Sequence, residues 1–451
     1  MAQELGRVIF TRDRYARSWS LGDRKNPICK TPILMQLNGD PEMEEFLSPF
    51  SSKTDSNIPS TLSVSSKVPL SPPDFSHKGP NYESFIGHVL PPSLDEANAG
   101  EPAGSGQLLP VSWQRLSHDR DLLDSSLNPS IIVLVDSVQL AAQPGKLVKA
   151  IHVLKNKFPD SLLWTPGIGG PDNAAVLNWF GVDIFDLSRS RMCNSAGVIL
   201  SENGPRMPDD SMSEAATMEV QIQHWKQSIA SIKSNLKNGT LRSLVDKQSL
   251  NSPNLVEHLR SHDKICSEQP GLLSSHVDNE KILDCSSPNT LNDPVVKEWG
   301  DFISNRYKAP NGLDNVLILL PCSARKPYRL SKSHGRFIRA INSNSCHEVM
   351  VTSPLGLVPR DLEEIWPASH YDIPVTGDWS HDELIRTQTM LDSLLSRHGY
   401  NLVINHSSME LKTGDVELIE TRNGLSPGSG EALDNLSESV KEAIQRFNVN
   451  K

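Results

Sequence analysis

The stretch IIVLV at residues 131–135, and KLVKAIHVLKNKF after it at 146–158, decide how the first half of the chain folds. IIVLV has the length and unbroken apolar character of a buried strand, whereas the second segment repeats apolar residues at helical spacing. SLLWTPGIGG (161–170) then predicts a strand ending in a Pro/Gly turn, DNAAVLNWFG (172–181) a helix, and VDIFDL (182–187) another strand. Short connections between these elements indicate parallel pairing, hence a barrel or a doubly wound sheet.

A second alternation of strands and helices lies near the C-terminus. Its four predicted strands are VLILL (316–320), EVMVTS (348–353), YDIPVT (371–376) and NLVINH (401–406). Ser380 and Glu383 have the spacing of a capping box, which predicts that the helix between the last two strands begins there. Because ligands of open α/β sheets bind beyond the carboxyl ends of strands, we expect the loops after the first three strands to converge on one pocket.

Composition divides the chain into segments. Residues 1–250 form the first predicted domain, interrupted at 48–106 by a stretch rich in Ser and Pro that buries too little apolar surface to fold alone. Residues 251–296 are predicted to be a helix and a polar linker, 297–424 a C-terminal catalytic α/β domain, and 425–451 a short tail helix.

The overall composition excludes several classes of protein. A net charge of -10 over 451 residues argues against a protein that coats nucleic acid by charge alone. No apolar run approaches the roughly 20 residues of a membrane helix, and MAQELGRVIF lacks the apolar core of a signal peptide. The six cysteines are scattered without a CxxC pair, so we expect no metal site and no disulfide framework. These features predict a reduced, cytoplasmic protein without membrane contact; the oligomeric state is left open.

The loop after the strand at 316–320 is strongly basic. Between residues 321 and 340 it carries six cations and no acid: Arg325, Lys326, Arg329, Lys332, Arg336 and Arg339. The positive electrostatic potential of such a loop suits the binding of a phosphate backbone. Charge alone, however, favours the simpler interpretation of a solvated helix face.

The same loop contains several side chains that could take part in catalysis. Cys322, one residue past the strand and close to Lys326, is either a nucleophile with a lowered pKa or a small buried residue. His334 is either a general acid/base or a helix residue with an ordinary hydrogen bond. Tyr328 and Ser331 donate hydrogen bonds, stack on a base, or simply pack. Their concentration at one predicted strand end favours a site.

The spacing of these residues resembles a known signature. Pro321-Cys322, three residues, Lys326-Pro327-Tyr328, two residues, Ser331, two residues, His334 is similar to the motif of the archaeosine synthases, archaeal paralogues of the tRNA-guanine transglycosylases. TSPLGLVPRDLEEIWPASHYDIPVTGDW (352–379) also resembles their C-terminal catalytic region. LLWTPGIGGPDNAAVLNWFGVDIFD (162–186) and LKNGTLRSLVD (236–246) resemble their transglycosylase-like part.

The resemblance implies a fold and a reaction. The fold is a degenerate TIM-barrel-like N-terminal domain of transglycosylase type, used for tRNA binding, followed by a C-terminal α/β three-layer domain. Members of the family act on tRNA that already carries 7-cyano-7-deazaguanine (preQ0) in the D-loop. They add free lysine, a co-substrate, across the nitrile, and no bound cofactor is expected. A radical SAM partner then cleaves the adduct to leave the amidine of archaeosine.

The resemblance also assigns residues. The expected catalytic residues are Cys322, Lys326, Tyr328, Ser331 and His334. The expected tRNA- and substrate-binding residues are Arg325, Arg329, Lys332, Arg336, Ser353, Arg360, Tyr371, Asp372 and Asp186. In one hypothesis Lys326 stabilises the nitrogen anion formed when an amine attacks the nitrile, and His334 carries the proton. In another, Cys322 attacks first and forms a thioimidate that lysine displaces.

The sequence departs from the family in three places. Cys193 is the only cysteine between residues 30 and 265, so the zinc site of the transglycosylases is not expected. Asp186 falls where those enzymes have their nucleophile, and a structural role is favoured for it here. Roughly 45 residues follow His406, too few for the usual RNA-binding PUA domain, so tRNA affinity is expected to be weaker or supplied by another chain. A non-catalytic tRNA-binding module and a true transglycosylase therefore remain alternatives.

Overall fold

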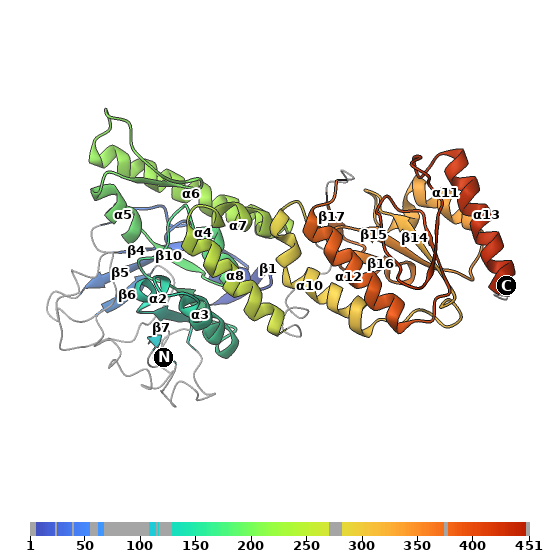
Figure 1. Ribbon diagram of the computed structural model, residues 1–451. Helices are drawn as coiled ribbons and strands as arrows, with labels where there is room; N and C mark the ends of the chain where they lie inside the picture. Colours follow the sequence, from blue (N-terminus) through green and yellow to red (C-terminus); the bar gives the residue numbers. More distant parts are fainter. Residues whose placement is uncertain are drawn as a thin grey trace. The chain divides into compact units, whose positions relative to one another are not determined.

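The structure is a computed structural model, and it divides into two units, Met1–Asp278 and Asn279–Lys451. It describes residues 6–22, 25–37, 40–54, 62–66, 108–113, 116, 129–269, 282–373 and 378–447. Most of the Ser/Pro-rich stretch predicted at 48–106, the middle of the predicted linker and the end of the strand predicted at 371–376 lie outside these residues. The two units are described separately below, since each has its own sheet (Figure 1).

The first unit is built on a mostly parallel sheet of the order β6-β5-β4-β10-β9-β8-β7. The strands are β4 (Ile33–Gln36), β5 (Phe50–Thr54), β6 (Leu62–Ser66), β7 (Leu108–Val111), β8 (Ile131–Leu134), β9 (Leu162–Trp164) and β10 (Ile184–Asp186). Only β5 and β6 pair antiparallel, so the predicted parallel pairing is confirmed. The first parallel strand, β4, lies beside the last, β10, as in a barrel. Among the described strands no pairing joins β6 to β7, so the degenerate barrel stays a prediction.

Alternate residues of the strands bury opposite faces of this sheet. Ile131 and Val133 pack with the antiparallel meander of β1 (Arg7–Asp13), β2 (Ala16–Gly22) and β3 (Pro27–Lys30). Ile132 and Leu134 belong to the cluster formed with the helices. The described helices of this unit are α2 (Ser137–Ala141), α3 (Lys146–Lys157), α4 (Ala174–Phe180), α5 (Ser188–Ser195), α6 (Glu214–Asn238), α7 (Leu241–Ser249) and α8 (Pro253–Glu268). A hairpin of β11 (Ile199–Ser201) and β12 (Gly204–Arg206) completes the unit.

The second unit contains a five-stranded sheet of the order β16-β15-β14-β18-β19. Its strands are β14 (Val316–Pro321), β15 (His347–Thr352), β16 (Gly356–Pro359), β18 (Leu402–Asn405) and β19 (Glu417–Glu420). All neighbours pair in parallel except β15 and β16, which form an antiparallel edge. Because β14 is central and buried on both faces, its sequence is continuously apolar, which is why it was the clearest strand to predict.

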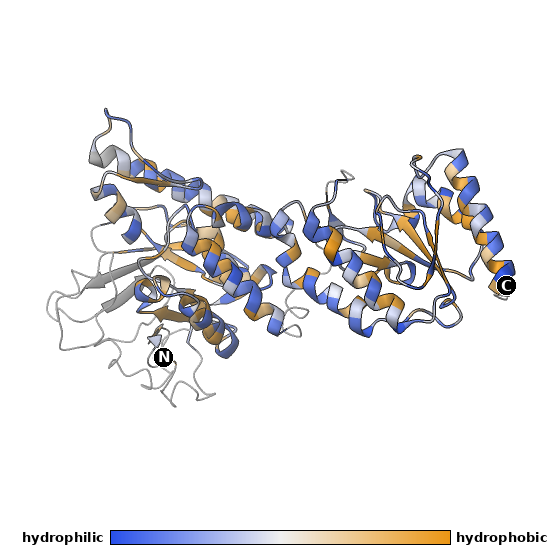
Figure 2. Ribbon diagram, in the orientation of Figure 1, coloured by the Kyte–Doolittle hydropathy of each residue, from blue (hydrophilic) through white to orange (hydrophobic). Residues whose placement is uncertain are grey.

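Helices cover both faces of this sheet. Figure 1 shows α10 (Pro294–Asp301) and α12 (His381–Arg397) on one side of it, and α11 (Lys332–Ile341) and α13 (Gly430–Phe447) on the other. In Figure 2 hydrophobic residues concentrate in the strands, while the helices carry hydrophilic residues on their outer faces. The capping box predicted at Ser380 and Glu383 is confirmed at the start of α12.

The structure differs from the predicted elements in two places. Only Tyr371–Asp372 (β17) of the strand predicted at 371–376 is described, and it pairs with β13 (Leu283–Asp284) rather than with the main sheet. Strand β16 was not predicted: residues 354–370 were interpreted as a loop, and β16 itself contains a proline. An edge strand tolerates Pro359 at its end, where no ladder hydrogen bond from that nitrogen is needed.

The predicted segment 251–296 is divided between the two units. Helix α8 packs against α3, α4 and α7 of the first unit, whereas β13 and α10 belong to the second. The predicted tail helix at 425–451 corresponds to α13, which packs against α11 and β18 and so forms part of the second unit. In the described part of the chain, no helix has the length and apolarity needed to cross a membrane.

Candidate active site in the second unit

Three loops of the second unit bring side chains to the carboxyl ends of parallel strands. Cys322 directly follows β14, Thr352 is the last residue of the neighbouring β15, and Tyr371 begins β17. The segment that connects β14 to α11 contains Tyr328 in a single 3-10 turn. The predicted convergence therefore holds for the loops after β14 and β15, which meet beside Tyr371; the loop predicted after 371–376 is described only from residue 378.

Cys322 and Lys326 form an electrostatically coupled pair. Burial raises the pKa of the Cys322 thiol, while the nearby Lys326 and a hydrogen bond with the Thr352 hydroxyl act in the opposite direction. Burial lowers the pKa of the Lys326 amine, and Cys322, Asp372 and Cys285 oppose that shift. Each group thus favours the charged form of the other.

The amine of Lys326 is held over an aromatic ring rather than by a hydrogen bond. Its Nζ lies 4.0 Å from the centroid of the Tyr371 ring, a cation–π geometry. Among the described residues the buried Nζ atom has no hydrogen-bond partner. Its N–H donors are thus buried and not engaged by any hydrogen bond within the described part of the chain.

Three hydroxyl groups from separate elements lie next to one another in this site. The Thr352 Oγ1 and Tyr371 hydroxyl oxygens are 2.5 Å apart, and the Tyr371 hydroxyl is hydrogen-bonded in turn to that of Tyr328. All three side chains are buried. Thr352 was missed from the sequence, because a threonine at the end of a strand carries no signal beyond its β propensity.

His334 does not have the geometry of a proton carrier. It is fully buried, its Nε2 donates to the carbonyl of Pro321 at 3.0 Å, and its Nδ1 accepts from Nη2 of Arg360 at 3.1 Å. Burial, with Arg360 adding to it, lowers the pKa of His334 to about 3. Both nitrogens are occupied and the ring is neutral, so the structure indicates that His334 ties α11 to β14 and positions Arg360.

Ser331 has a similarly structural place. It is the N-cap of α11, and its Oγ accepts from the backbone N–H of His334 at 3.2 Å. A side-chain oxygen at this position satisfies one of the amides that a helix start leaves unpaired. The motif thus divides in two: Cys322 and Lys326 interact electrostatically with each other, while Ser331 and His334 hold the loop in place.

Acidic residues from β15 and from the loop after β16 form ion pairs with two of the predicted tRNA-binding cations. Arg360 donates to Glu348 at 2.7 Å and to Glu363 at 3.0 Å. The Nε of Arg329 donates to the fully buried Glu363 at 2.6 Å, and Arg329 also pairs with Glu364. Arg360 is thereby part of an internal ion network, and Arg329 remains about half exposed. The role of Glu363 could not be predicted from the sequence, because Arg329 is about thirty residues away from it and the pairing with Arg360 depends on the conformation of the loop.

Other predicted binding residues lie at the surface. Arg325, Lys332 and Arg336 are exposed, and Arg336 donates to the carbonyl of Gly428 at 3.3 Å. Ser353, in contrast, donates a hydrogen bond to Glu383 at the start of α12. Asp372 is exposed and close enough to Lys326 to favour its ammonium form.

In the first unit, the Asp186 carboxylate accepts hydrogen bonds from neighbouring residues of the same unit. It ends β10 with 2% exposure, and its carboxylate accepts from the indole of Trp164 at 3.0 Å, the amide of Gly167 at 3.1 Å and the amide of Ser188 at 2.9 Å. These donors fix the end of β9 and the start of α5. The structure therefore gives Asp186 a structural place, rather than the substrate contact for which it was also considered.

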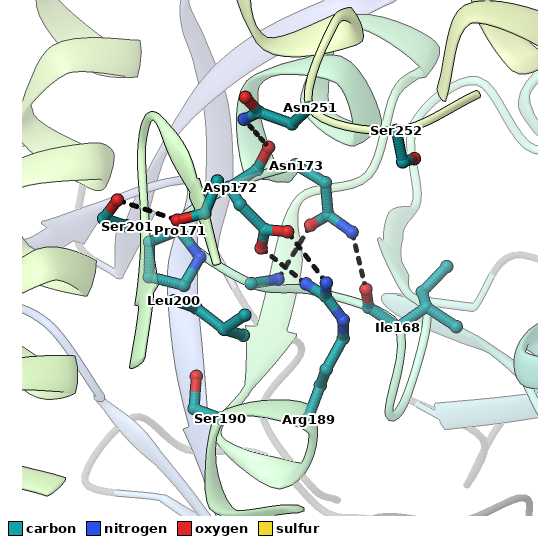
Figure 3. Close-up of polar contacts among 12 residues, drawn as sticks. Ile168, Pro171, Asp172, Asn173, Arg189, Ser190, Leu200, Ser201, Asn251 and Ser252 are labelled. Carbon is teal, nitrogen blue, oxygen red and sulfur yellow. Dashed lines mark hydrogen bonds and ion pairs between the residues drawn. The ribbon is translucent and has the colours of Figure 1, made fainter. Parts of the chain in front are cut away.

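The loop that follows β9 is fixed in the same way (Figure 3). Arg189 of α5 reaches both carboxylate oxygens of Asp172, at 2.5 and 2.8 Å. Asn173 accepts from the amide of Gly170 at 2.7 Å and donates to the carbonyl of Ile168 at 2.8 Å. Asn251 donates to the carbonyl of Asp172. The predicted Pro/Gly turn is confirmed, and its polar side chains stabilise the fold.

A buried cluster of His152, His262 and Cys266 in the first unit has metal-ligating side chains. The ring of His262 lies between the other two: its Nδ1 is 2.9 Å from Nε2 of His152, and its Nε2 is 3.6 Å from the sulfur of Cys266. One nitrogen of each histidine and the sulfur of Cys266 all lie within 4.8 Å of one another, so the three side chains form a group that could hold a metal ion. The expectation of no metal site stays a prediction.

Comparison with known proteins places the chain beside archaeal enzymes of tRNA modification. Residues 296–440 match the model of a family described as a domain of unknown function, DUF5591. The archaeosine synthase subunit alpha of Thermoplasma acidophilum is 33% identical over 285 residues, which are 61% of this chain and 52% of that protein. The archaeosine synthase subunit alpha of Methanosarcina acetivorans is 32% identical over 335 residues, 66% of this chain and 52% of that protein.

A more distant relative comes from the parent family. The tRNA-guanine(15) transglycosylase of Methanobrevibacter smithii is 24% identical over 346 residues, 69% of this chain and 50% of that protein. The chain thus spans about half the length of the curated relatives it matches. The predicted resemblance to archaeosine synthases is confirmed.

Proposed function

Starting from this similarity, we propose that the chain acts in archaeosine biosynthesis, adding free lysine to the nitrile of 7-cyano-7-deazaguanine in the D-loop of tRNA. One observation carries the proposal beyond the similarity: Cys322 and Lys326 lie together at the end of β14, and the Lys326 Nζ has no hydrogen-bond partner among the described residues. A thiol and an amine in this arrangement suit the activation of an electrophilic nitrile carbon.

The first step is attack by sulfur. The Cys322 thiolate forms a bond to the nitrile carbon, one pair of π electrons moves to the nitrogen, and Lys326 in its ammonium form supplies a proton to that nitrogen. The product is a neutral thioimidate joined to Cys322, and Lys326 is left as a free amine. Burial, which lowers the pKa of Lys326, makes this proton easier to give.

The second step is displacement by lysine. An amino group of the substrate lysine adds to the thioimidate carbon and passes a proton to the neutral Lys326 amine. The tetrahedral intermediate collapses, the carbon–sulfur bond breaks, and Cys322 leaves as a thiolate. The tRNA then carries a substituted amidine, and both Lys326 and Cys322 have returned to their starting forms. No further acid or base is needed, which agrees with the structural place of His334.

We propose that tRNA binds through the exposed cations beside this site. Arg325, Lys332 and Arg336 carry positive charge on the surface of the loop and α11, within a unit of otherwise mixed charge. Contacts of this kind position a phosphate backbone without reading its sequence. The first unit is proposed to be a transglycosylase-like tRNA-binding domain, because its strand order and its distant relative both point to that family.

A second protein is proposed to complete the pathway. Two of the relatives are named as subunit alpha, which implies a partner subunit for those proteins. A lysine-substituted amidine retains a carbon–nitrogen bond that must be cleaved to give archaeosine. We propose that a radical SAM partner performs this cleavage.

Transfer of radiolabelled lysine to nitrile-bearing tRNA tests the proposal. Label in the tRNA with the wild-type chain, and none with Cys322→Ala, supports it. Binding of tRNA without transfer of label supports the non-catalytic module instead. Exchange of a labelled base supports a transglycosylase, a result that the internal hydrogen bonds of Asp186 argue against.

A further inference from the structure

A cavity at the surface of the second unit takes no part in the two steps proposed above. It has a volume of about 400 Å³ and lies between α12 and the helix formed by α10 and η5 (Phe302–Arg306), on one side of the sheet (Figure 1). Element η5 is a π-helix, a rare form that is frequent at functional sites. The residues that line the cavity include Lys297, Asp301, Ser304, Arg386, Thr389 and Ser393.

Arg386 is a cation of this cavity that has no acidic partner. Its Nη2 donates to the carbonyl of Val296 at 2.5 Å, which holds the guanidinium against α10. Its Nε is buried, and among the described residues it has no hydrogen-bond partner. Burial lowers the pKa of the Arg386 guanidinium to about 10, and no described carboxylate offsets that shift. Because buried charges are normally paired, Arg386 has the position of a cation whose counterion is a ligand.

Gly300 of α10 allows the guanidinium to lie in this position. A Cβ atom at residue 300 would lie 2.5 Å from Nη2 and 3.1 Å from Cζ of Arg386. Both distances are shorter than ordinary van der Waals contacts, so any larger residue would displace the guanidinium. The position of Arg386 therefore depends on the facing helix as well as on its own.

Lys297 adds a second cation at the same end of the cavity. Arg386 donates to the residue that precedes Lys297 in α10. Further along α12, Arg397 donates to the carbonyls of Ile303 and Tyr307 at 2.6 and 2.7 Å. The two helices therefore run in the same direction, and Lys297 lies at the level of Arg386. Its side chain is exposed, and no carboxylate of the described part of the chain forms an ion pair with it.

The acid that lines the described part of the cavity is already engaged. Asp301 accepts from the side-chain amide of Asn305 at 2.8 Å and lies 3.6 Å from the guanidinium of Arg306. It is about one turn beyond Lys297 along α10. The end of the cavity that holds Arg386 and Lys297 thus keeps a positive charge without compensation.

We infer that this cavity binds a phosphate group through Arg386 and Lys297. The planar guanidinium can donate to two oxygens of a phosphate, and the flexible ammonium of Lys297 can donate to a third. A carboxylate has two oxygens and is matched by one guanidinium alone, so a pair of cations favours phosphate. The volume suits a phosphate carried on a sugar as well as the free ion. The inference goes beyond the proposed function and does not depend on lysine transfer.

Isothermal titration of the full chain with inorganic phosphate, at constant ionic strength, tests the site. The wild type should bind phosphate saturably. Arg386→Met keeps the apolar stem and removes the charge, and it should weaken phosphate binding roughly tenfold through loss of a charge-assisted hydrogen bond. Lys297→Met should weaken binding less, because the amine is exposed. Lys441→Ala removes one exposed cation from α13 and should leave the affinity unchanged.

Three results would overturn the inference. These are the absence of saturable phosphate binding in the wild type, equal affinities in the wild type, Arg386→Met and Lys297→Met, and acetate binding as tight as that of phosphate. Thermal unfolding shows whether Arg386→Met is folded. Lys297→Met changes an exposed side chain, so it answers the question even if Arg386→Met does not fold.

A second titration, in the presence of saturating tRNA, distinguishes the two sources of the phosphate. If the cavity takes a phosphate of the tRNA backbone, bound tRNA abolishes phosphate binding, and Lys297→Met lowers the slope of log K against log[salt] for tRNA by about one. If the cavity takes the free ion, tRNA leaves the phosphate titration unchanged. Both results agree with a phosphate site. Neither titration contains lysine, so failure of the phosphate site and failure of the lysine-transfer reaction are separate outcomes.

Discussion

The Nζ atom of Lys326 lies 4.0 Å from the centroid of the Tyr371 ring, and among the described residues no hydrogen-bond acceptor reaches it. A buried amine without an acceptor is costly to maintain, and such groups concentrate at functional sites. The same amine lies close enough to Cys322 to oppose the rise in its thiol pKa. Cys322 and Lys326 are therefore the two residues of the loop after β14 on which the proposed reaction depends.

Lys326→Ala should reduce lysine transfer about 10²- to 10³-fold, because the nitrogen anion loses its proton donor. The initial rate of labelling at saturating tRNA and lysine measures this loss. Lys332→Ala is the matched control: it removes an exposed cation from the start of α11 and should leave the saturated rate near wild type. Unchanged turnover in Lys326→Ala would remove the role assigned to it.

His334→Gln should keep most of the activity, because glutamine offers both a donor and an acceptor in place of the neutral ring. His334→Ala should lower the free energy of unfolding by about 2–4 kcal/mol, since the carbonyl of Pro321 and the guanidinium of Arg360 lose a buried partner. Urea unfolding and the lysine-transfer rate measure the two effects. A large loss of rate in a stable His334→Gln variant would show that the imidazole itself carries protons.

Acid should destabilise the first unit through its buried histidines. Burial lowers the pKa of His152 to about 4, below the ordinary value of 6.5, so the folded unit binds this proton less readily than the unfolded chain. The stability due to neutral His152 is complete above pH 6.5 and is lost as the pH falls toward 4, by about 3 kcal/mol. Urea unfolding between pH 7 and 4 should show a shallower slope for His152→Gln. Equal slopes for both proteins would contradict the assignment.

Arg360→Ala should destabilise the second unit by about 3–5 kcal/mol, because it leaves the buried Glu363 without one of its cations. Its effect on the salt dependence of tRNA binding should be small. Arg336→Ala should do the reverse: stability is retained, and the slope of log K against log[salt] falls by about one. A reduced salt slope in Arg360→Ala, without loss of stability, would restore Arg360 to the tRNA surface.

The sequence predicted the site where its signal was local. The buried run at 316–320 fixed a central strand, and everything that follows such a strand lies at the ligand-binding edge of a parallel sheet, so Cys322 and Lys326 could be placed from the sequence. Thr352 and Glu363 could not, because their roles depend on which distant loops meet. The hydrogen bond from Arg360 to His334 could not be predicted for the same reason, because Arg360 is supplied from another element.

The strand pattern shows the same limit. Continuous apolar runs identified β8 and β14, which are buried on both faces. The edge strand β16, with a proline at its end, and the two-residue pair of β13 and β17 lack any such pattern. Which segments pair as such short strands depends on tertiary contacts rather than on the β propensity of their own residues.

The thioimidate on Cys322 is the central claim, and its direct detection is the sharpest test. The wild-type chain is incubated with nitrile-bearing tRNA in the absence of lysine, treated with nuclease, and analysed by mass spectrometry of the intact protein and of the peptide containing Cys322. The account predicts one modified-nucleoside adduct on Cys322, lost on addition of lysine and absent from Cys322→Ala. An unmodified Cys322 in a preparation that transfers lysine would contradict the thioimidate. Direct attack of the lysine amino group on the nitrile would then be the remaining mechanism.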